Sequence, residues 1–453
     1  MGRVFLRKEF SGYLGENRSI LDINASFIPN TPTPTPSPTK TNTPTPSVTQ
    51  THTPTVTPTM TPTPSSTPSS INFCIGTGFD DYTYSVVGDG SNILVAGVFN
   101  YYKNFFSPGV VKLNKTTGAV DTGFTSPLSY TNTVYVAKPS SYYPGKTYIG
   151  GIGLNPNFQR LNSDGSVDTT FSGLTTFTSG QVTDFVELSG GSIIIVGTFT
   201  TINGSSRNRI AKLDINGSLD STFAVGTGLN SSAITIEKSL DESHVFVGGA
   251  MTSYSGISTT RLVKINSTTG VLNTTFAPST FSDQVRGLTF DGSGNLWAVG
   301  NFSPYPGSSG FSNFICALET TSGTTTSGVD FGNGFEDSPF GIKYDSVNDR
   351  MIINTQSIPN TDNANQYQGI TFYGRIISLL PDGNIDTSFG SLTGTTYGFN
   401  KEIPGFAAFN NELFVDSSGD VYVTGTFTSF SGNRYDRLIK LDDTGQSITR
   451  TNC

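Results

Sequence analysis

Histidine, cysteine and charged residues are scarce in this sequence. Its 453 residues include two histidines and three cysteines, and charged residues make up 13% of the chain. His52 lies in a threonine- and proline-rich tract, so the rest of the chain supplies only His244. A Cys/His zinc site of the usual spacing is therefore excluded, and the rest of the chain cannot supply two histidines to a triad or a metal centre. We expect no metal and no cofactor.

Long apolar runs and basic patches are also missing. No segment has about 18 consecutive apolar residues, so no transmembrane helix and no membrane insertion are predicted. The first eight residues hold too few apolar side chains for a secretory signal. The formal net charge is −8, which argues against binding to a phosphate backbone. The sequence predicts no nucleic-acid partner.

Acidic residues do not follow the spacing of a catalytic or calcium site. Residues 214–220 resemble an oxygen-rich calcium loop, but the equivalent residues 266–270 keep only the turn-forming glycine. Scattered carboxylates such as Asp184, Glu336 and Asp337 show no recognisable pair spacing. We therefore expect hairpin turns rather than calcium loops, no catalytic residues and no enzymatic activity.

What the sequence does contain is an internal repeat. Between Ile93 and Leu441 an apolar run ending in glycine, a loop, a second apolar run and an Asp-x-x-Phe-like tag recur at a spacing of about 55 residues. The third copy has strand-like runs at 181–186, 192–197, 209–213 and 218–223. Glycine-containing turns join them, as in antiparallel hairpins. Seven such copies predict an all-β fold, a seven-bladed β-propeller of four-stranded antiparallel blades.

The repeat resembles a known family. An apolar run, Gly-x-Phe-Thr, Arg-Ile/Leu-x-Lys-Leu and Asp-x-x-Gly-Ser-Leu-Asp-x-x-Phe are similar to the delta-60 repeats of β-propellers. The resemblance covers residues 71–453. The fifth and sixth copies depart from it, because residues 318–327 lack the usual turn and Asn354 replaces the closing glycine. It implies a propeller domain over these residues and no common enzymatic activity.

The two ends of the repeat region match one part of a single repeat. Residues 71–78 match 221–228 of the third copy, and residues 440–453 match 212–225 of the same copy. Both ends therefore map to the outer strand of one blade, as ring closure requires. We predict that Cys74 and Cys453 lie close together, either as a disulfide or as two small apolar residues. Cys316, in an apolar run, is expected to be a buried free thiol.

Recurring polar and aromatic residues are expected to be structural. The same slot before the third strand holds Arg209, Arg261, Arg375 and Arg437. Because these arginines recur, we expect ion pairs or carbonyl bonds between blades. We expect the phenylalanine of each Asp-x-x-Phe tag to pack between blades for the same reason.

Loops that break the symmetry of the repeat are the predicted binding surface. Two of them, 355–373 and 391–411, are longer than their counterparts. Tyrosine beside asparagine or glutamine suits recognition of a glycan or protein, because the ring stacks and the amide bonds to hydroxyl groups. The candidate ligand-binding residues are Tyr101, Tyr102, Tyr254, Tyr305, Asn365, Gln366, Tyr367, Gln368, Tyr373, Tyr397, Phe399 and Tyr435. The alternative is exposed loops without a ligand.

Two segments precede the repeats. Thr, Pro and Ser make up 33 of the 40 residues in 31–70, a composition that predicts an extended linker. Residues 1–30 are too apolar for a disordered tail and too few for their own core, so we expect them to dock on another protein or to trimerise. The predicted anchoring residues are Phe10, Tyr13, Leu14, Ile20, Leu21, Ile23 and Phe27.

A small anchor, a Thr/Pro-rich stalk and a β-rich head resemble the layout of virion-attached fibres and decoration proteins of tailed bacteriophages. The resemblance implies a non-enzymatic structural protein at the virion surface. Residues 1–30 would bind a capsid or tail protein, and the propeller would face a host-surface glycan or protein. Anchor and stalk would also allow a homo-oligomer. The alternatives are a bacterial cell-surface or exported adhesin and, third, a glycan-active enzyme.

Overall fold

In a computed structural model the described residues are 73–306, 311–355, 364–373, 375–390, 398–399 and 410–451. The chain divides into residues 1–66 and 67–453, and only the second unit contains described residues. The predicted anchor and linker, 1–30 and 31–70, lie outside them and stay predictions. The described residues form strands and no helix, so they contain no helix that could span a membrane.

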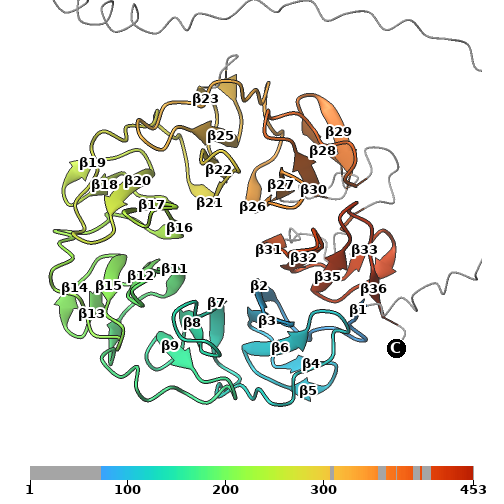
Figure 1. Cartoon of the computed structure of the whole chain (residues 1–453), viewed down its shortest axis with the longest axis horizontal. Helices are drawn as coiled ribbons and strands as arrows, with labels where there is room; N and C mark the ends of the chain where they lie inside the picture. The colour runs from blue at the N-terminus through green and yellow to red at the C-terminus, as the bar shows by residue number, and fades with distance from the viewer. Residues whose placement is uncertain are drawn as a thin grey trace, which may run out of the picture. The chain divides into compact units, whose positions relative to one another are not determined.

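Seven three-stranded antiparallel sheets form the framework of the described chain. In chain order, and from the innermost strand outward, they are β2 (Thr83–Asp89), β3 (Asn92–Gly97) and β6 (Val110–Asn114); β7 (Thr133–Pro139), β8 (Thr147–Ile152) and β9 (Phe158–Leu161); β11 (Val182–Glu187), β12 (Ile193–Gly197) and β15 (Ile210–Leu213); β16 (Ala233–Lys238), β17 (His244–Gly249) and β20 (Leu262–Asn266); β21 (Val285–Phe290), β22 (Leu296–Gly300) and β25 (Ile315–Leu318); β26 (Pro339–Asp345), β27 (Arg350–Thr355) and β30 (Ile376–Leu379); and β31 (Asn410–Val415), β32 (Val421–Gly425) and β35 (Leu438–Leu441). They lie around a common centre in a propeller-like ring (Figure 1).

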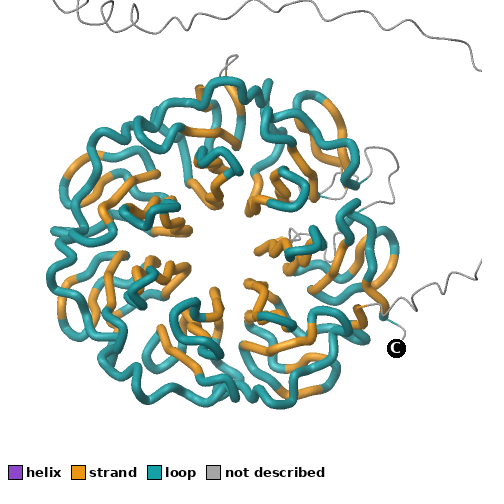
Figure 2. The backbone as a smooth tube through the Cα atoms, in the orientation of Figure 1, coloured by secondary structure: helices purple, strands orange, loops and turns teal. Residues whose placement is uncertain are grey.

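Small outer strands connect or flank the middle and outer strands of these sheets. They are β4 (Tyr101–Tyr102) with β5 (Phe105–Phe106); β10 (Phe177–Thr178) with β13 (Thr201–Ile202) and β14 (Ser205–Ser206); β18 (Ser253–Tyr254) with β19 (Ile257–Ser258); β23 (Tyr305–Pro306) with β24 (Phe311–Ser312); β28 (Ala364–Tyr367) with β29 (Ile370–Tyr373); and β33 (Ser429–Phe430) with β34 (Asn433–Arg434). Figure 2 shows the loops that join them running around the outside of the ring.

The predicted fourth strand of each unit is not formed. In the third unit the run 218–223 makes a single bridge, Leu213 to Leu219. Asp220 Oδ1 then accepts the N–H of Thr222 at 2.9 Å, which turns the chain away from the sheet. The other six units have equivalent single bridges, Leu113–Val120, Leu161–Val167, Ile265–Leu272, Leu318–Thr325, Leu379–Ile385 and Leu441–Ser447. The Asp-x-x-Phe tag thus ends the ladder after one residue pair.

Middle strands are apolar because neighbouring sheets cover both of their faces. All five residues of β12 are buried, as expected for a strand with no solvated side. Its Ile194 and Val196 belong to one core cluster with Val245 and Val247 of the next sheet. The core is therefore divided among the contacts between adjacent sheets.

The glycine that closes the first apolar run is required by close backbone approach. A Cβ on Gly197 would lie 2.0 Å from the carbonyl oxygen of Gln181, a distance that no side chain tolerates. In the sixth sheet the register pairs Thr355 with Pro339 and Asn354 with Gly341. Thr355, not Asn354, therefore occupies the place of the glycine, and the sequence alignment there was wrong by one residue.

The two ends of the repeat region meet, as predicted. β1 (Phe73–Cys74) pairs in parallel with β36 (Thr449–Arg450). Between the first and last sheets, the Gly425 N–H donates to Thr83 Oγ1 at 3.0 Å. Cys74 is disulfide-bonded and Cys316 is free and buried. Cys453 lies outside the described residues, so its pairing with Cys74 stays a prediction.

The recurring arginines join adjacent sheets through carbonyl groups, which confirms their structural role. Arg209 Nη1 donates to Leu229 O and Arg437 Nη1 to Phe79 O, each at 2.8 Å. Arg261 makes the equivalent bond to Phe281 O. Arg375 is buried in the same slot. The four tag phenylalanines are buried, which agrees with their predicted packing role; they are Phe124, Phe171, Phe223 and Phe389.

Candidate functional site

The innermost strand of every sheet carries a β-bulge at the same place. In the third sheet Val182 pairs with Gly197 and Asp184 with Val196, so that Thr183 is left over. A bulge re-aims the extra side chain. In the seventh sheet the register shifts across Asn411 and Glu412. The single bulged residues of the other sheets are Tyr84, Tyr135, Ile234, Arg286 and Phe340.

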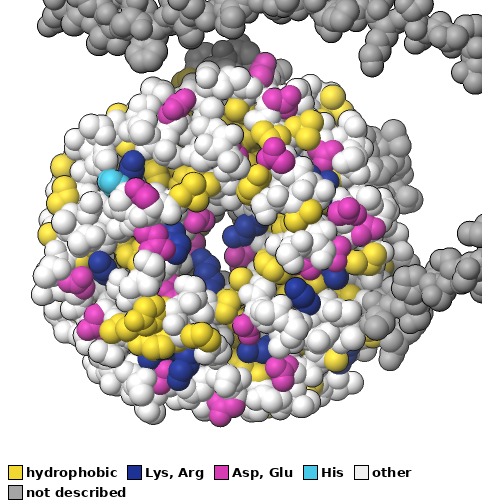
Figure 3. All heavy atoms as spheres, viewed as in Figure 1, with side chains coloured by type: hydrophobic (Ala, Val, Ile, Leu, Met, Phe, Trp, Pro, Cys, Tyr) yellow, Lys and Arg dark blue, Asp and Glu magenta, His cyan; other side chains and the backbone are white. Residues whose placement is uncertain are grey.

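These bulged residues surround a central cavity of about 410 Å³. All six single bulged residues line it, together with Glu412, so each innermost strand contributes. Lys and Arg side chains gather with Asp and Glu around the central opening in Figure 3. The volume falls in the range of roughly 300–1,000 Å³ that is typical of small-molecule sites.

At the bulge the type of side chain differs from one sheet to the next. The residue before it is small or β-branched in most sheets, as with Thr83, Val182 and Ala233. The bulged residue itself is tyrosine in two sheets, and threonine, isoleucine, arginine or phenylalanine in others. Sequence reasoning missed this set, because the left-over residue is known only once the register is known.

One tight ion pair spans three sheets at the cavity wall. Lys138 Nζ lies 2.6 Å from Asp184 Oδ1 and donates to Phe185 O at 2.8 Å. Asp184 Oδ2 accepts the N–H of Ile236 at 3.0 Å. Burial opposes the charged form of Lys138, but Asp184 and Glu412 outweigh it and raise the pKa of Lys138. The Asp184 carboxylate therefore links three strands, β7, β11 and β16.

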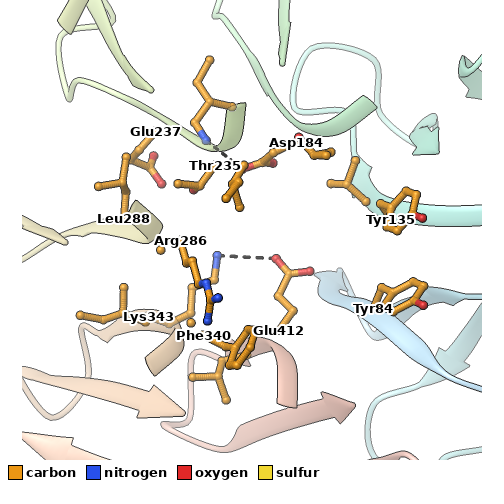
Figure 4. Close-up of a pocket in the computed structure, with 18 of the residues that line it drawn as sticks. Tyr84, Tyr135, Asp184, Thr235, Glu237, Arg286, Leu288, Phe340, Lys343 and Glu412 are labelled. Carbon is orange, nitrogen blue, oxygen red and sulfur yellow. Dashed lines mark hydrogen bonds and ion pairs between the residues drawn. The ribbon is translucent and has the colours of Figure 1, made fainter. Parts of the chain in front are cut away.

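A looser pair lies on the other side of the cavity. Lys343 Nζ is 3.7 Å from Glu412 Oε1. Glu412 Oε2 accepts the N–H of Val86 at 3.2 Å, which links the last sheet to the first. Figure 4 shows the ends of the Lys343 and Glu412 side chains next to each other, joined by a dashed line.

Glu237 and Arg286 are the two charged lining residues without an ion pair among the described residues. Glu237 Oε1 accepts the N–H of Lys238 at 3.2 Å. Burial raises the pKa of Glu237, against the opposing effect of Lys343 and Lys138. Arg286 Nη1 donates to Ser338 Oγ at 3.2 Å. No donor of this guanidinium has a carboxylate partner among the described residues. Burial lowers the pKa of Arg286, and the charges of Asp283 and Asp337 oppose this effect.

Aromatic rings also line the cavity. Tyr84 and Tyr135 are stacked, with ring centroids 5.2 Å apart and planes at 23°. They lie side by side across the cavity from Glu237 and Leu288 (Figure 4). Burial raises the pKa of Tyr84 to about 12, so its hydroxyl stays protonated. The guanidinium carbon of Arg286 lies 4.5 Å from the ring centroid of Phe340.

A second cluster of aromatic side chains is exposed outside the cavity. Tyr101, Phe106 and Tyr130 are 36%, 45% and 59% exposed. The ring centroid of Phe106 lies 5.4 Å from that of Tyr101 and 5.0 Å from that of Tyr130. The two tyrosine hydroxyl oxygens are 3.1 Å apart. We call this set the aromatic cluster; of its members, only Tyr101 was among the predicted binding residues.

Most of the other predicted tyrosines are core residues. The Tyr102 hydroxyl donates to Gly118 O at 2.9 Å, that of Tyr254 to Gly270 O at 2.6 Å. The prediction that these side chains decorate exposed loops is wrong, because each packs inside a sheet unit and bonds to its turn. The predicted binding residues that are buried are Tyr102, Tyr254, Tyr305, Asn365, Tyr367, Phe399 and Tyr435.

The remaining predicted residues are exposed, half-buried or outside the described side chains. Gln366 is exposed, and Gln368 Nε2 donates to Asp330 O at 3.0 Å. Tyr397 and the side chain of Tyr373 lie outside the described part. So do the predicted anchoring residues, Phe10, Tyr13, Leu14, Ile20, Leu21, Ile23 and Phe27.

The oxygen-rich turns act as turns. Asp214 Oδ1 accepts the N–H groups of Asn216 at 2.9 Å and Ser218 at 2.8 Å, so the carboxylate stabilises its own hairpin. Within the described ranges, no group of three or more His, Cys, Asp or Glu side chains is placed to hold a metal ion.

Comparison with known proteins supports a β-propeller repeat. Residues 91–124, 145–171, 189–223 and 244–276 match the β-propeller domain of unknown function DUF5122. These segments lie in the first four sheet units. No curated protein matches the sequence.

Two solved structures show remote similarity. The computationally designed protein Ika8 is 9% identical, with a TM-score of 0.46 over 83% of this chain and 88% of its own. The WD40 β-propeller domain of Doa1 is 12% identical, with a TM-score of 0.35 over 61% of this chain and 90% of its own.

Proposed function

We propose that the protein is a non-enzymatic structural protein of a virion that displays a binding head toward a host-surface glycan or protein. The head would be a closed seven-bladed propeller of the delta-60 type. Residues 1–30 would attach to a capsid or tail protein, and 31–70 would extend the head from the particle.

The aromatic cluster is the observation that carries the binding role. Its three rings contact one another, and each side chain is more than a third exposed. Exposed aromatic groups with hydroxyl tips are typical of protein and glycan recognition surfaces. The cluster lies on the β4–β5 hairpin and the loop before β7, so a rigid sheet unit holds it in place.

A non-enzymatic role fits the way in which the cavity carboxylates are used. Asp184 and Glu412 each bind a lysine and a backbone N–H of a neighbouring sheet. Groups that hold adjacent sheets together are poorly placed to act on a substrate. Glu237 is the exception, since burial raises its pKa, and it is the residue that a glycan-active enzyme would use as its acid.

The binding role is tested with the full-length protein on host cells. Replacing the aromatic cluster by Tyr101→Ser, Phe106→Ser and Tyr130→Ser should reduce cell binding about tenfold or more, because clustered aromatic side chains dominate recognition surfaces. Leu240→Ser is the matched control, since Leu240 is 81% exposed and lies in a different sheet unit. Unchanged binding by the triple variant would contradict the proposed surface.

Location is tested separately by mass spectrometry and electron microscopy of purified particles. Detection of the protein at one defined position on the particle would support the virion role. Recovery only from a bacterial envelope or the medium would instead support the adhesin. Turnover of a glycan that Glu237→Gln abolishes would favour the enzyme.

A further inference from the structure

We propose that the central cavity binds a carboxylate-bearing sugar of the uronic acid class, with Arg286 holding the carboxylate. This site is distinct from the aromatic cluster and does not depend on the proposed function. Three features of the cavity support this ligand: a cation without an ion pair, aromatic walls and neutral polar groups.

Arg286 is the group that selects for a carboxylate. A guanidinium has five N–H donors in a planar fork that matches a carboxylate bidentately. Only its bond to Ser338 Oγ, at 3.2 Å, is made by the described protein. The adjacent Phe340 ring, 4.5 Å away, holds the plane of the fork. Arg286 is half-buried, and a partly desolvated guanidinium without an ion pair is stabilised when an anion completes it.

The other two cations of the cavity do not compete for the same anion. Lys138 is paired with Asp184 at 2.6 Å, and Lys343 with Glu412 at 3.7 Å. Three cations and three carboxylates line the cavity. Two of each are paired, which leaves Arg286 to bind one anionic group and Glu237 to accept hydrogen bonds from hydroxyl groups. A polyanion such as a phosphate chain would meet Glu237 and Glu412.

The rest of the wall suits a sugar ring rather than an aliphatic acid. The stacked pair Tyr84 and Tyr135 offers apolar ring surface on one side. Glu237, Thr235 and Gln284 line the cavity and can bond to ring hydroxyl groups. An aliphatic acid would leave these polar groups unpaired, which costs affinity. The volume of about 410 Å³ accommodates one or two sugar residues.

The test uses two sugars that differ only at C6, glucuronic acid and glucose, titrated into the full-length protein by calorimetry at pH 7. We expect glucuronate to bind about tenfold more tightly than glucose. Arg286→Met, which keeps the stem against Phe340, should abolish that preference, and Arg286→Lys should restore part of it. Thermal melting of each variant checks that the fold is kept. The aromatic-cluster triple variant is the control and should bind glucuronate like the wild type.

Equal binding of the two sugars, no binding of either, or a preference that survives Arg286→Met would overturn this site. None of these results affects the cell-binding assay of the aromatic cluster. The two proposals can therefore fail separately.

Discussion

Tyrosines of the outer hairpins and tyrosines of the innermost strands belong to the same repeat, yet they have opposite roles. Tyr254 recurs as Tyr102, Tyr305 and Tyr367, and all are fully buried. Tyr84 and Tyr135 occupy a bulge that holds a different residue in most other sheets, and they line the cavity. A residue type that recurs at one position marks the framework. A position whose residue changes while its backbone geometry recurs marks a candidate site.

The largest expected effect is a difference in stability between variants of the two kinds of tyrosine. Tyr254→Ala should lower the free energy of unfolding by about 3–5 kcal/mol, because it leaves a cavity in a closed core and removes the bond to Gly270 O. Tyr135→Ala, at a half-buried cavity wall, should cost only about 1 kcal/mol. Urea unfolding of both variants measures the difference. Equal costs would mean that the bulged tyrosine is also framework.

Features that depend on local sequence patterns could be predicted. The repeat, the sheets and the meeting of the two ends follow from apolar periodicity and turn glycines, which act locally. Residue type alone does not distinguish the buried tyrosines from loop tyrosines, whereas their recurrence at one position of the repeat marks them as framework. The fourth strand was overpredicted, since residues 218–223 look strand-like until the Asp220–Thr222 turn is seen.

The cavity could not be predicted in the same way. A bulge depends on how Val182 and Asp184 pair with β12, and nothing in the local sequence marks Thr183 as the residue left out. Lys138 and Asp184 are 46 residues apart and meet only after adjacent sheets have packed. The charge network is therefore a property of the ring.

The carboxylate of Asp168, a framework residue, should contribute strongly to the free energy of unfolding, and acid should remove that contribution. Asp168 is buried against Arg160 at 2.7 Å. Burial alone would raise the pKa of Asp168, but bonds from Thr170, Lys146 and Arg160 outweigh it and lower that pKa. Asp168→Asn should cost about 3 kcal/mol at pH 7, because it leaves the buried guanidinium unpaired.

The sign of the pH dependence follows from the lowered pKa. The stabilisation by Asp168 is present above the unfolded value of about 4 and is lost as the pH falls through the lower folded pKa. The gap between wild type and Asp168→Asn should therefore shrink in urea unfolding between pH 5 and pH 2. A gap that stays constant over this range would contradict the ion-pair explanation.

The Glu237 carboxyl in the cavity should make stability depend on pH in the opposite direction and by a smaller amount. Because the folded pKa of Glu237 is raised by burial, its contribution is most favourable below the unfolded value and is lost as the pH rises through the folded pKa. Glu237→Gln should thus be slightly more stable than wild type at pH 8 and equal to it near pH 4. Thermal melting at the two pH values measures this. Loss of stability at pH 8 would place Glu237 in the framework.

The most direct measurement is a crystal structure of the full-length protein soaked with glucuronate. The account predicts sugar density in the central cavity, with its carboxylate on the Arg286 guanidinium and its ring beside Tyr84 and Tyr135. Density confined to the aromatic cluster, or a cavity empty under saturating glucuronate, would contradict the claim that the varying bulge residues form a binding site.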